Sequence, residues 1–366
     1  MTYPKYKFET VGSFLPTAEF MAAKEKHTAG KISDEDFRSL ENTAIRDIVE
    51  RQLAAGMNEV TSGEIRRKVW DKDFYFGLNG IGIERVDRGH LYQNLEAFTD
   101  IPRITGRISY NPEHPFFEDF IFLRDIVGNR AECRQTIPSP ADLYLEVLSL
   151  SDGLSKGIYT DRHMLISDIS TAYRQTVKHF YALGCRHIQF DDTACGSFAD
   201  SFFIKKIMMG GYDPETLARD IIETINSSSD DLPDDMEISI YMSAGEQVVP
   251  DWPVTADNAE PLATILRNLN ADKFFLPFHA ENTDTIRILE AIPKGRKVAL
   301  GLISAHNPQE ENPTTIMEAV AAAQIYVKPE DLSICPSSGF KMTNYIAKGL
   351  VYEDQWRKLK SFGEAI

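Results

Sequence analysis

The sequence is poor in cysteine and in long apolar runs. Crossing a bilayer takes roughly 18 consecutive apolar residues, and no stretch of the 366 residues provides them. The opening residues MTYPKYKFET also lack the apolar segment of a secretory signal. Cys133, Cys185, Cys195 and Cys335 form no CxxC pair, which argues against a zinc ribbon or a thioredoxin-like motif. Scattered thiols are typical of a reducing compartment, so we expect a cytoplasmic protein without a membrane partner.

Positive charge is also scarce. The chain has 39 Lys and Arg against 55 Asp and Glu, a net charge of −16, and contains no dense basic run. Because affinity for nucleic acid comes from clustered positive charge, we expect no nucleic-acid partner. No linker rich in Pro, Gly or Ser divides the chain, and 43% apolar residues suffice for a large core. We therefore expect one domain spanning residues 1–366 with a small-molecule substrate; the composition does not predict an oligomeric state.

Short runs rich in Val, Ile, Phe and Tyr alternate with amphipathic segments, the pattern of parallel strands linked by helices. Strands are predicted at 8–14, 58–64, 131–139, 187–192, 237–243, 273–279, 298–304 and 332–338. The clearest helix is 34–55, which Ser33 can cap and Gly56 can end. Further helices are predicted at 165–183, 214–226, 259–269, 283–291 and 314–326. Eight such units predict an α/β fold, a (β/α)8 TIM barrel, with an inserted β-hairpin at about 81–110.

Catalytic residues of such barrels lie where the strands end. Glu64 follows a predicted strand in SGEIRR, where it could bind a substrate amine or act as a base. The adjacent Arg66 and Arg67 could hold a carboxylate with two hydrogen bonds each. A structural ion pair at the end of the strand is the alternative interpretation for these three residues.

Other strand ends carry carboxylates and imidazoles. Asp191 and Asp192 close HIQFDD, and strand alternation directs one to the barrel mouth and the other to the helix layer, where it could cap a helix. His306 is a candidate acid or base, or else a loop anchor. His279 and Glu281 could share a metal or a proton, although an ordinary hydrogen-bonded pair is the commoner arrangement.

Taken together, the strand-end motifs resemble a known family. They are VGSF at 11–14, SGEIRR at 62–67, IQFDD at 188–192, IYMSAGE at 240–246, GLISAHNP at 301–308 and CPSSGFK at 335–341. Their order and spacing are similar to the catalytic barrel of cobalamin-independent methionine synthase, above all to its short single-barrel relatives. The resemblance covers nearly the whole chain and implies a barrel like those of methionine synthase and uroporphyrinogen decarboxylase. It further implies a transferase of methionine biosynthesis that moves a methyl group from methyltetrahydrofolate to homocysteine, whose sulfur is activated by zinc.

The residues that hold the amino acid in this family are largely kept. The family's Gly-Ser after the first strand falls on Gly12 and Ser13, and its substrate-binding glutamate falls on Glu64. The aspartate of the family's Asp-Glu-Pro motif falls on Asp191, and its histidine proposed as a proton donor falls on His306. The resemblance therefore implies that this chain binds a small amino acid or carboxylate.

The zinc-ligand positions of the family are substituted. They fall on Tyr241, Ser243, Pro277 and Ser338, whereas zinc is held by deprotonated S, N and O donors at about 2.0–2.3 Å. We therefore expect no metal at these positions. A relocated site would have to draw on His279, Glu281 and Cys335. Folate is a possible cofactor through the resemblance only, since none of these motifs identifies it.

These observations lead to a divergent, zinc-free enzyme of the methionine synthase family. Its acid–base chemistry would be carried by Asp191 or Asp192, by His306 and by Tyr241. One alternative is a metal-free lyase or decarboxylase on the same barrel, an analogy at the level of the fold. Another is a non-catalytic protein that keeps the amino-acid site and has lost turnover.

Overall fold

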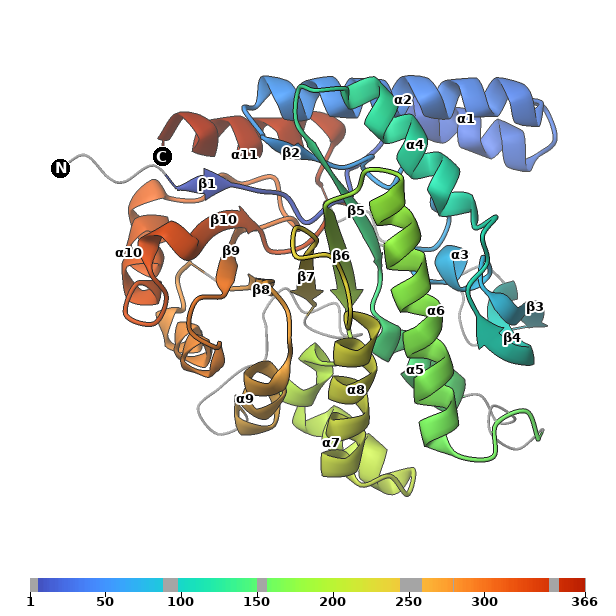
Figure 1. Cartoon of the computed structure of the whole chain (residues 1–366). Helices are drawn as coiled ribbons and strands as arrows, with labels where there is room; N and C mark the ends of the chain where they lie inside the picture. The colour runs from blue at the N-terminus through green and yellow to red at the C-terminus, as the bar shows by residue number, and fades with distance from the viewer. Residues whose placement is uncertain are drawn as a thin grey trace.

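The computed structural model describes residues 6–87, 98–149, 157–243, 259–278, 280–341 and 349–365. Eight parallel strands form one sheet in the order β1-β10-β9-β8-β7-β6-β5-β2 (Figure 1). These strands are β1 (Lys7–Phe8), β2 (Glu59–Val60), β5 (Glu132–Pro138), β6 (His187–Asp192), β7 (Glu237–Met242), β8 (Lys273–Pro277), β9 (Lys297–Ile303) and β10 (Leu332–Pro336). All eight lie within or overlap the predicted ranges, and β1 and β2 are much shorter than predicted.

The sheet closes on itself at its two short edge strands. Beyond β1 and β2, Ser13 and Gly63 form an isolated parallel bridge, and the amide of Phe14 donates to the carbonyl of Gly63 at 3.1 Å. This seam joins the two ends of the strand order, while helices surround the sheet on the outside (Figure 1). The predicted (β/α)8 barrel is therefore confirmed.

The predicted helices are present. In α2 (Asp34–Ala54), Ser33 Oγ accepts the amide of Asp36 at 3.1 Å, and Gly56 follows the last turn with a φ of +80°. The others are α6 (Arg162–Ala182), α8 (Pro214–Ser228), α9 (Ala259–Asn268), η2 (Thr283–Ala291) and α10 (Pro313–Ala323). Of these, η2 is a 3-10 helix. In the part of the chain that the structure describes, no helix combines the length and apolarity needed to cross a membrane.

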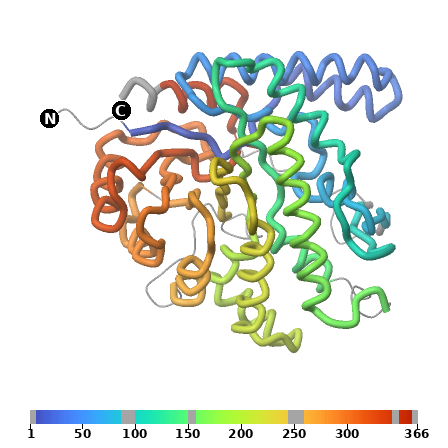
Figure 2. The backbone as a smooth tube through the Cα atoms, in the orientation of Figure 1, coloured from blue at the N-terminus to red at the C-terminus, as the bar shows by residue number. Residues whose placement is uncertain are grey.

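Several further helices were not predicted. They are α1 (Ala18–Thr28), α3 (Lys72–Tyr75), α4 (Pro115–Val127), α5 (Pro140–Ser149), η1 (Gly196–Ala199), α7 (Ser201–Met209), η3 (Pro329–Asp331) and α11 (Tyr352–Ala365). Figure 2 shows α11 returning to the side of the barrel where the chain begins. There the side chain of Gln355 donates to the carbonyl of Leu15 at 3.0 Å and accepts its amide at 2.8 Å.

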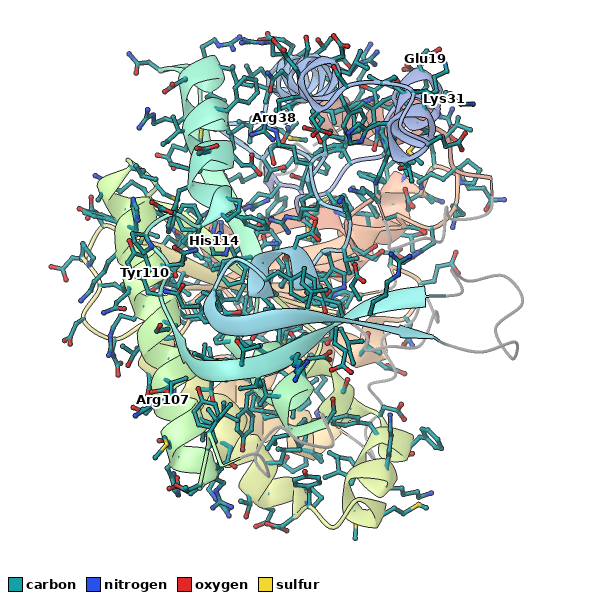
Figure 3. All side chains as sticks on the ribbon, turned by 90° about the vertical axis from the view of Figure 1, so that its right-hand side faces the viewer. Glu19, Lys31, Arg38, Arg107, Tyr110 and His114 are labelled. Carbon is teal, nitrogen blue, oxygen red and sulfur yellow. The ribbon has the colours of Figure 1, made fainter. Side chains whose placement is uncertain are left out.

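The expected hairpin is an antiparallel pair outside the barrel sheet. It consists of β3 (Asn79–Asp87) and β4 (Phe98–Ser109), and it lies on the flank of the barrel (Figure 3). Arg107 of β4 fastens it to α6 because its Nε donates to Asp168 Oδ2 at 2.7 Å. The inserted β-hairpin is thus confirmed.

The amino ends of the strands hold a buried network of charges. Lys273 Nζ lies 2.8 Å from Glu9 Oε2, and Arg134 Nη1 lies 2.9 Å from Glu59 Oε1. His187 Nδ1 lies 2.5 Å from the other oxygen of Glu59. Glu9, Arg134, His187 and Lys273 are buried, and Glu59 is half-buried, with a side chain that is 8% exposed. In barrels this end of the strands serves stability, which leaves the opposite end for the functional site.

Candidate functional site

Glu64 is held in an unusual backbone conformation at the carboxyl end of β2. Its φ is +57°, a region that side-chain-bearing residues rarely occupy and that is found mainly at functional sites. Its Oε1 accepts the hydroxyl of Thr136 at 2.8 Å and lies 3.2 Å from Arg67 Nη1. The turn and these two partners fix the buried carboxylate at the barrel mouth.

Asp191 is the penultimate residue of β6 and joins Glu64 at the mouth. Gln189 Nε2 donates to its Oδ1 at 2.6 Å, and its Oδ2 lies 3.9 Å from Arg67 Nη1. The residue is only 8% exposed. Burial, followed by the negative charge of Glu64, raises the pKa of Asp191 to about 8 even though Arg67 opposes the shift. The site therefore contains a carboxyl group that titrates near neutral pH.

Asp192 faces the helix layer instead. Its Oδ1 accepts the amide of Cys195 at 2.7 Å, so it caps the turn that leads into η1. Burial raises the pKa of this carboxyl as well. The alternation expected along β6 is present, and the capping alternative describes what Asp192 does in the structure.

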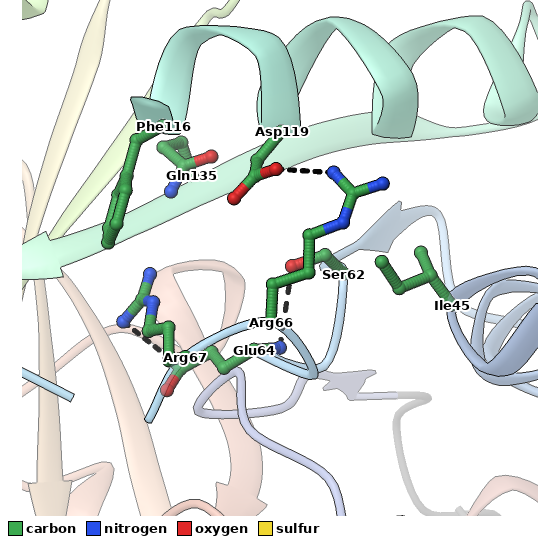
Figure 4. A pocket seen from close by; sticks show the side chains of 8 residues that line it. All are labelled: Ile45, Ser62, Glu64, Arg66, Arg67, Phe116, Asp119 and Gln135. Carbon is green, nitrogen blue, oxygen red and sulfur yellow. Dashed lines mark hydrogen bonds and ion pairs between the residues drawn. The ribbon is translucent and has the colours of Figure 1, made fainter. Parts of the chain in front are cut away.

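The two arginines of SGEIRR extend in opposite directions (Figure 4). Arg67 Nη2 donates to Thr136 Oγ1 at 2.6 Å, and its guanidinium lies 5.0 Å from the ring centroid of Phe116. Arg66 instead pairs with Asp119 of α4 and donates to Asn42 Oδ1 of α2 at 2.5 Å. Arg66 thus joins two outer helices, whereas Arg67 lies between Glu64 and Asp191.

A cavity of about 20 Å³ separates the two arginines, room for one water molecule. Its lining residues are Ile45, Ser62, Glu64, Arg66, Arg67, Phe116, Asp119 and Gln135. Two carboxylates and two guanidinium groups balance each other around it, so the cavity itself has no charge preference.

The loop after β10 supplies a residue that the sequence did not single out. Lys341 Nζ donates to the main-chain oxygens of Glu64 at 2.9 Å and of Arg67 at 3.0 Å. Its own carbonyl accepts the hydroxyl of Ser13 at 3.1 Å. Burial lowers the pKa of Lys341 to about 8. Lys341 thereby fixes the left-handed turn of Glu64 and ties it to Ser13 across the seam.

Replacing Lys341 tests this support. We expect Lys341→Met to lower the free energy of unfolding by about 1–3 kcal/mol, because two buried carbonyls lose their donor. Lys341→Arg, which keeps donors at the end of a long side chain, should recover part of the loss. Urea denaturation measures both. Equal stability of Lys341→Met and the wild type would contradict the supporting role.

Lys341 is the last residue of a motif that the sequence did mark, CPSSGFK at 335–341, so its position just after a strand was the available signal. Thr136 and Gln189 were missed for a different reason. They are polar residues inside buried strands, and nothing in the local sequence distinguishes a hydrogen-bond partner of a site from a satisfied core residue.

The resemblance assigns the family's zinc ligands to four positions whose side chains are poor metal donors. Tyr241 Oη donates to the carbonyl of Ser337 at 3.3 Å, and Ser338 Oγ donates to the carbonyl of Gly339 at 3.0 Å. Pro277 ends β8 and has no ionisable group, and Ser243 follows β7. Neutral hydroxyls do not replace thiolate and imidazole ligands, so these residues do not fit zinc.

The residues weighed for a relocated metal site do not gather in the described part of the chain. Glu281 is exposed, while Cys335 is buried inside the barrel against Phe275. His279 lies outside the described residues. Within the described ranges, no group of three or more His, Cys, Asp and Glu residues is placed to hold a metal ion. His306 is half-buried in the loop after β9, where its amide donates to Ser304 Oγ at 3.2 Å.

Comparison with known proteins places the chain in a family. No family model matches it. The uncharacterized protein YxjH of Bacillus subtilis is 32% identical over 97% of this chain and 92% of its own length. The solved structure of a putative vitamin-B12-independent methionine synthase from Listeria monocytogenes is 30% identical, covers 100% of this chain and 98% of its own, and gives a TM-score of 0.76. The chain belongs to the cobalamin-independent methionine synthase family.

A second solved methionine synthase supports the fold. The B12-independent methionine synthase from Shewanella sp. W3-18-1, solved in complex with selenomethionine, gives a TM-score of 0.68 over 98% of this chain and 96% of its own, at 18% identity. The family membership predicted from the strand-end motifs is confirmed by the 30% identity to the Listeria protein over the whole chain.

Proposed function

We propose that this member of the methionine synthase family binds a small α-amino acid at the barrel mouth. One observation carries the proposal: two buried carboxyl groups, Glu64 and Asp191, converge on the single guanidinium of Arg67. A substrate ammonium group supplies the missing positive charge and thereby favours ionisation of Asp191. Paired carboxylates at a strand end are the natural counterpart of a primary amine.

The other end of an amino acid also finds partners here. Arg67 Nη1 has no hydrogen-bond acceptor within the described residues, although Glu64 Oε1 lies 3.2 Å away as an ionic neighbour. Arg67 Nη1 is suited to a substrate carboxylate, and the hydroxyl of Ser13 would join it by giving up its hydrogen bond to the carbonyl of Lys341. The selenomethionine bound to the Shewanella relative supports an amino-acid ligand.

We further propose that the chemistry at this site does not proceed through a zinc-activated thiol, because the four substituted positions do not fit the metal. Methyl transfer from a folate to homocysteine, the family activity, would then be altered or lost. Asp191, with a pKa of about 8, is suited to accept or donate a proton near neutral pH. His306 and Tyr241 are the proposed partners in acid–base chemistry.

The first test is ligand-induced stabilisation. At 100 times Kd, an amino acid should stabilise the wild type by about 2.7 kcal/mol, seen as a rise in Tm with methionine or homocysteine. We expect Glu64→Gln to abolish this response because the neutral amide no longer attracts the ammonium group. Asp192→Asn is the matched control, since Asp192 neighbours the site in sequence but faces the helix layer.

The outcomes separate the hypotheses. A full ligand response in Glu64→Gln would contradict the binding mode. Stoichiometric zinc in untagged purified protein would contradict the metal-free chemistry. Binding of amino acids without turnover in methyl-transfer, lyase and decarboxylase assays would establish a non-catalytic binding protein.

A further inference from the structure

Tyr241 extends across the interior of the barrel. It stands on β7 directly beside Asp191 of β6 in the strand ladder. Its Oη nevertheless reaches the carbonyl of Ser337, just after β10, at 3.3 Å. Because β8 and β9 lie between β7 and β10 in the sheet order, the side chain makes this contact by bridging the lumen.

The space beneath this bridge is packed with neutral side chains. Phe275, Ala299 and Cys335 come from β8, β9 and β10, are at most 1% exposed and form a small cluster on which Tyr241 packs. Below them, at the amino ends of the strands, lies the buried charge network around Lys273. Tyr241 therefore separates the barrel mouth from the packed interior of the barrel.

The charged groups around Tyr241 disfavour a ligand whose side chain ends in an anion. Asp191, the ladder neighbour of Tyr241, is a carboxyl group. The two cations of the mouth already have partners. The guanidinium of Arg67 lies between Glu64 and Asp191 and donates to Thr136, and Lys341 donates to main-chain oxygens. A thiolate or carboxylate next to Tyr241 would thus face a hydroxyl, a carbonyl and a carboxyl group.

We propose that Tyr241 is the specificity-determining floor of the amino-acid pocket and selects a short, uncharged side chain such as a thioether or an alkyl group. The inference rests on the proposed amino-acid function of the site and adds the class of side chain. It also explains the substituted ligand positions in structural terms, since an aromatic ring occupies the centre of the barrel above Phe275 and Cys335.

Isothermal titration calorimetry tests whether Tyr241 limits the length and charge of the ligand side chain. For the wild type we expect methionine and norleucine to bind within about threefold of each other and glutamate, of similar length with an anionic tail, at least tenfold more weakly. Tyr241→Ala removes the aromatic ring and leaves room for a longer side chain. We therefore expect the ratio of the affinity for the S-butyl analogue of methionine to the affinity for methionine to rise by at least tenfold. Tyr241→Leu keeps more of the packing and should shift this ratio in the same direction, which covers a failure of the alanine variant to fold.

The control is another buried tyrosine. Tyr144, whose hydroxyl donates to Asp220 Oδ2 at 2.7 Å in the helix layer, is 1% exposed. Tyr144→Leu should lower stability and leave the ligand ratio unchanged. Two results would contradict the role of Tyr241 while leaving amino-acid binding in place. One is that glutamate binds as tightly as methionine, and the other is that both Tyr241 variants keep the wild-type ratio of affinities for the S-butyl analogue and methionine. A wild type that binds no amino acid would overturn the proposed function itself.

Discussion

We expect Asp191→Asn to raise the melting temperature of the unliganded protein at neutral pH and to remove its response to amino acids. The carboxyl is buried beside Glu64, and its folded-state pKa of about 8 lies far above the value of about 3.9 in an unfolded chain. Folding therefore opposes ionisation of Asp191, and this cost disappears with a neutral amide. Linkage sets an upper bound of about 4 kcal/mol for the gain at pH 7. Such a gain, together with the loss of the ligand response, would show that the proposed function of this carboxyl group lowers the stability of the fold.

The stability difference between Asp191→Asn and the wild type should depend on pH. Below about pH 4 both states are protonated, and the substitution should change stability little. As the pH rises from 4 to 8, the unfolded wild type loses this proton and the folded protein keeps it, so the advantage of Asp191→Asn should grow and then level off. Melting curves at pH 4, 6 and 8 measure it.

Asp192→Asn provides the comparison. The pKa of Asp192 is also raised by burial, so this variant should gain stability too, but it should keep the amino-acid response. Loss of the response in both variants, or a gain in Asp191→Asn that does not depend on pH, would contradict the assignment.

We expect Lys273→Met to lower the free energy of unfolding by about 3–5 kcal/mol, the usual effect of leaving a buried charge without its partner. Lys273 is 3% exposed, and its Nζ lies 2.8 Å from Glu9 and 3.1 Å from Glu237. Removing the amine leaves both carboxylates with less counter-charge. Urea denaturation measures the loss, and the double variant Lys273→Met with Glu9→Gln should recover part of it.

An exposed ion pair of similar length is the matched control. Arg267 Nη1 lies 2.7 Å from Glu260 Oε1 on α9, where both side chains are largely exposed. Because water screens such a pair, Arg267→Met should cost no more than about 1 kcal/mol. A comparable loss in the two variants would show that burial is not the source of the effect.

The same network should set the acid sensitivity of the fold. Burial alone would raise the pKa of Glu237, but the imidazole of His187 and the amine of Lys273 hold it at about 2. Likewise, His187 and Arg134 hold the pKa of Glu59 well below its usual range. The two ionised carboxylates, Glu237 and Glu59, stabilise the fold above the unfolded-state pKa of about 4.3. This contribution is lost as the pH falls toward 2. Lys273→Met should therefore unfold at a higher pH in an acid titration.

Much of the barrel could be predicted from the sequence, because buried parallel strands are continuous apolar runs separated by amphipathic helices. The failures have local causes. The segment Pro115–Val127 contains four phenylalanines and reads equally well as a strand, yet forms α4. The strands β1 and β2 are only two residues long because the backbone on either side of the seam pairs through the single bridge of Ser13 and Gly63.

The sequence could predict those residues of the candidate site that lie at the ends of strands. Glu64, Arg67 and Asp191 meet because the carboxyl ends of neighbouring parallel strands share one rim. Arg66 and Arg67 could not be told apart, since a left-handed residue at Glu64 breaks the alternation that would have assigned their directions. Lys341 reaches the site from 277 residues away in sequence, a relation that only the tertiary structure supplies.

The seam between β1 and β2 gives this site a second property. Ser13 belongs to one side of the seam and Glu64 to the other, and the sides are held by one bridge, by the amide of Phe14 and by Lys341. Local opening of the barrel at this line separates the groups that would hold the amino acid. An amino acid bound as proposed would connect the two sides of this sparsely paired seam. Its binding energy would also suppress the local opening from which proteolysis or aggregation could begin.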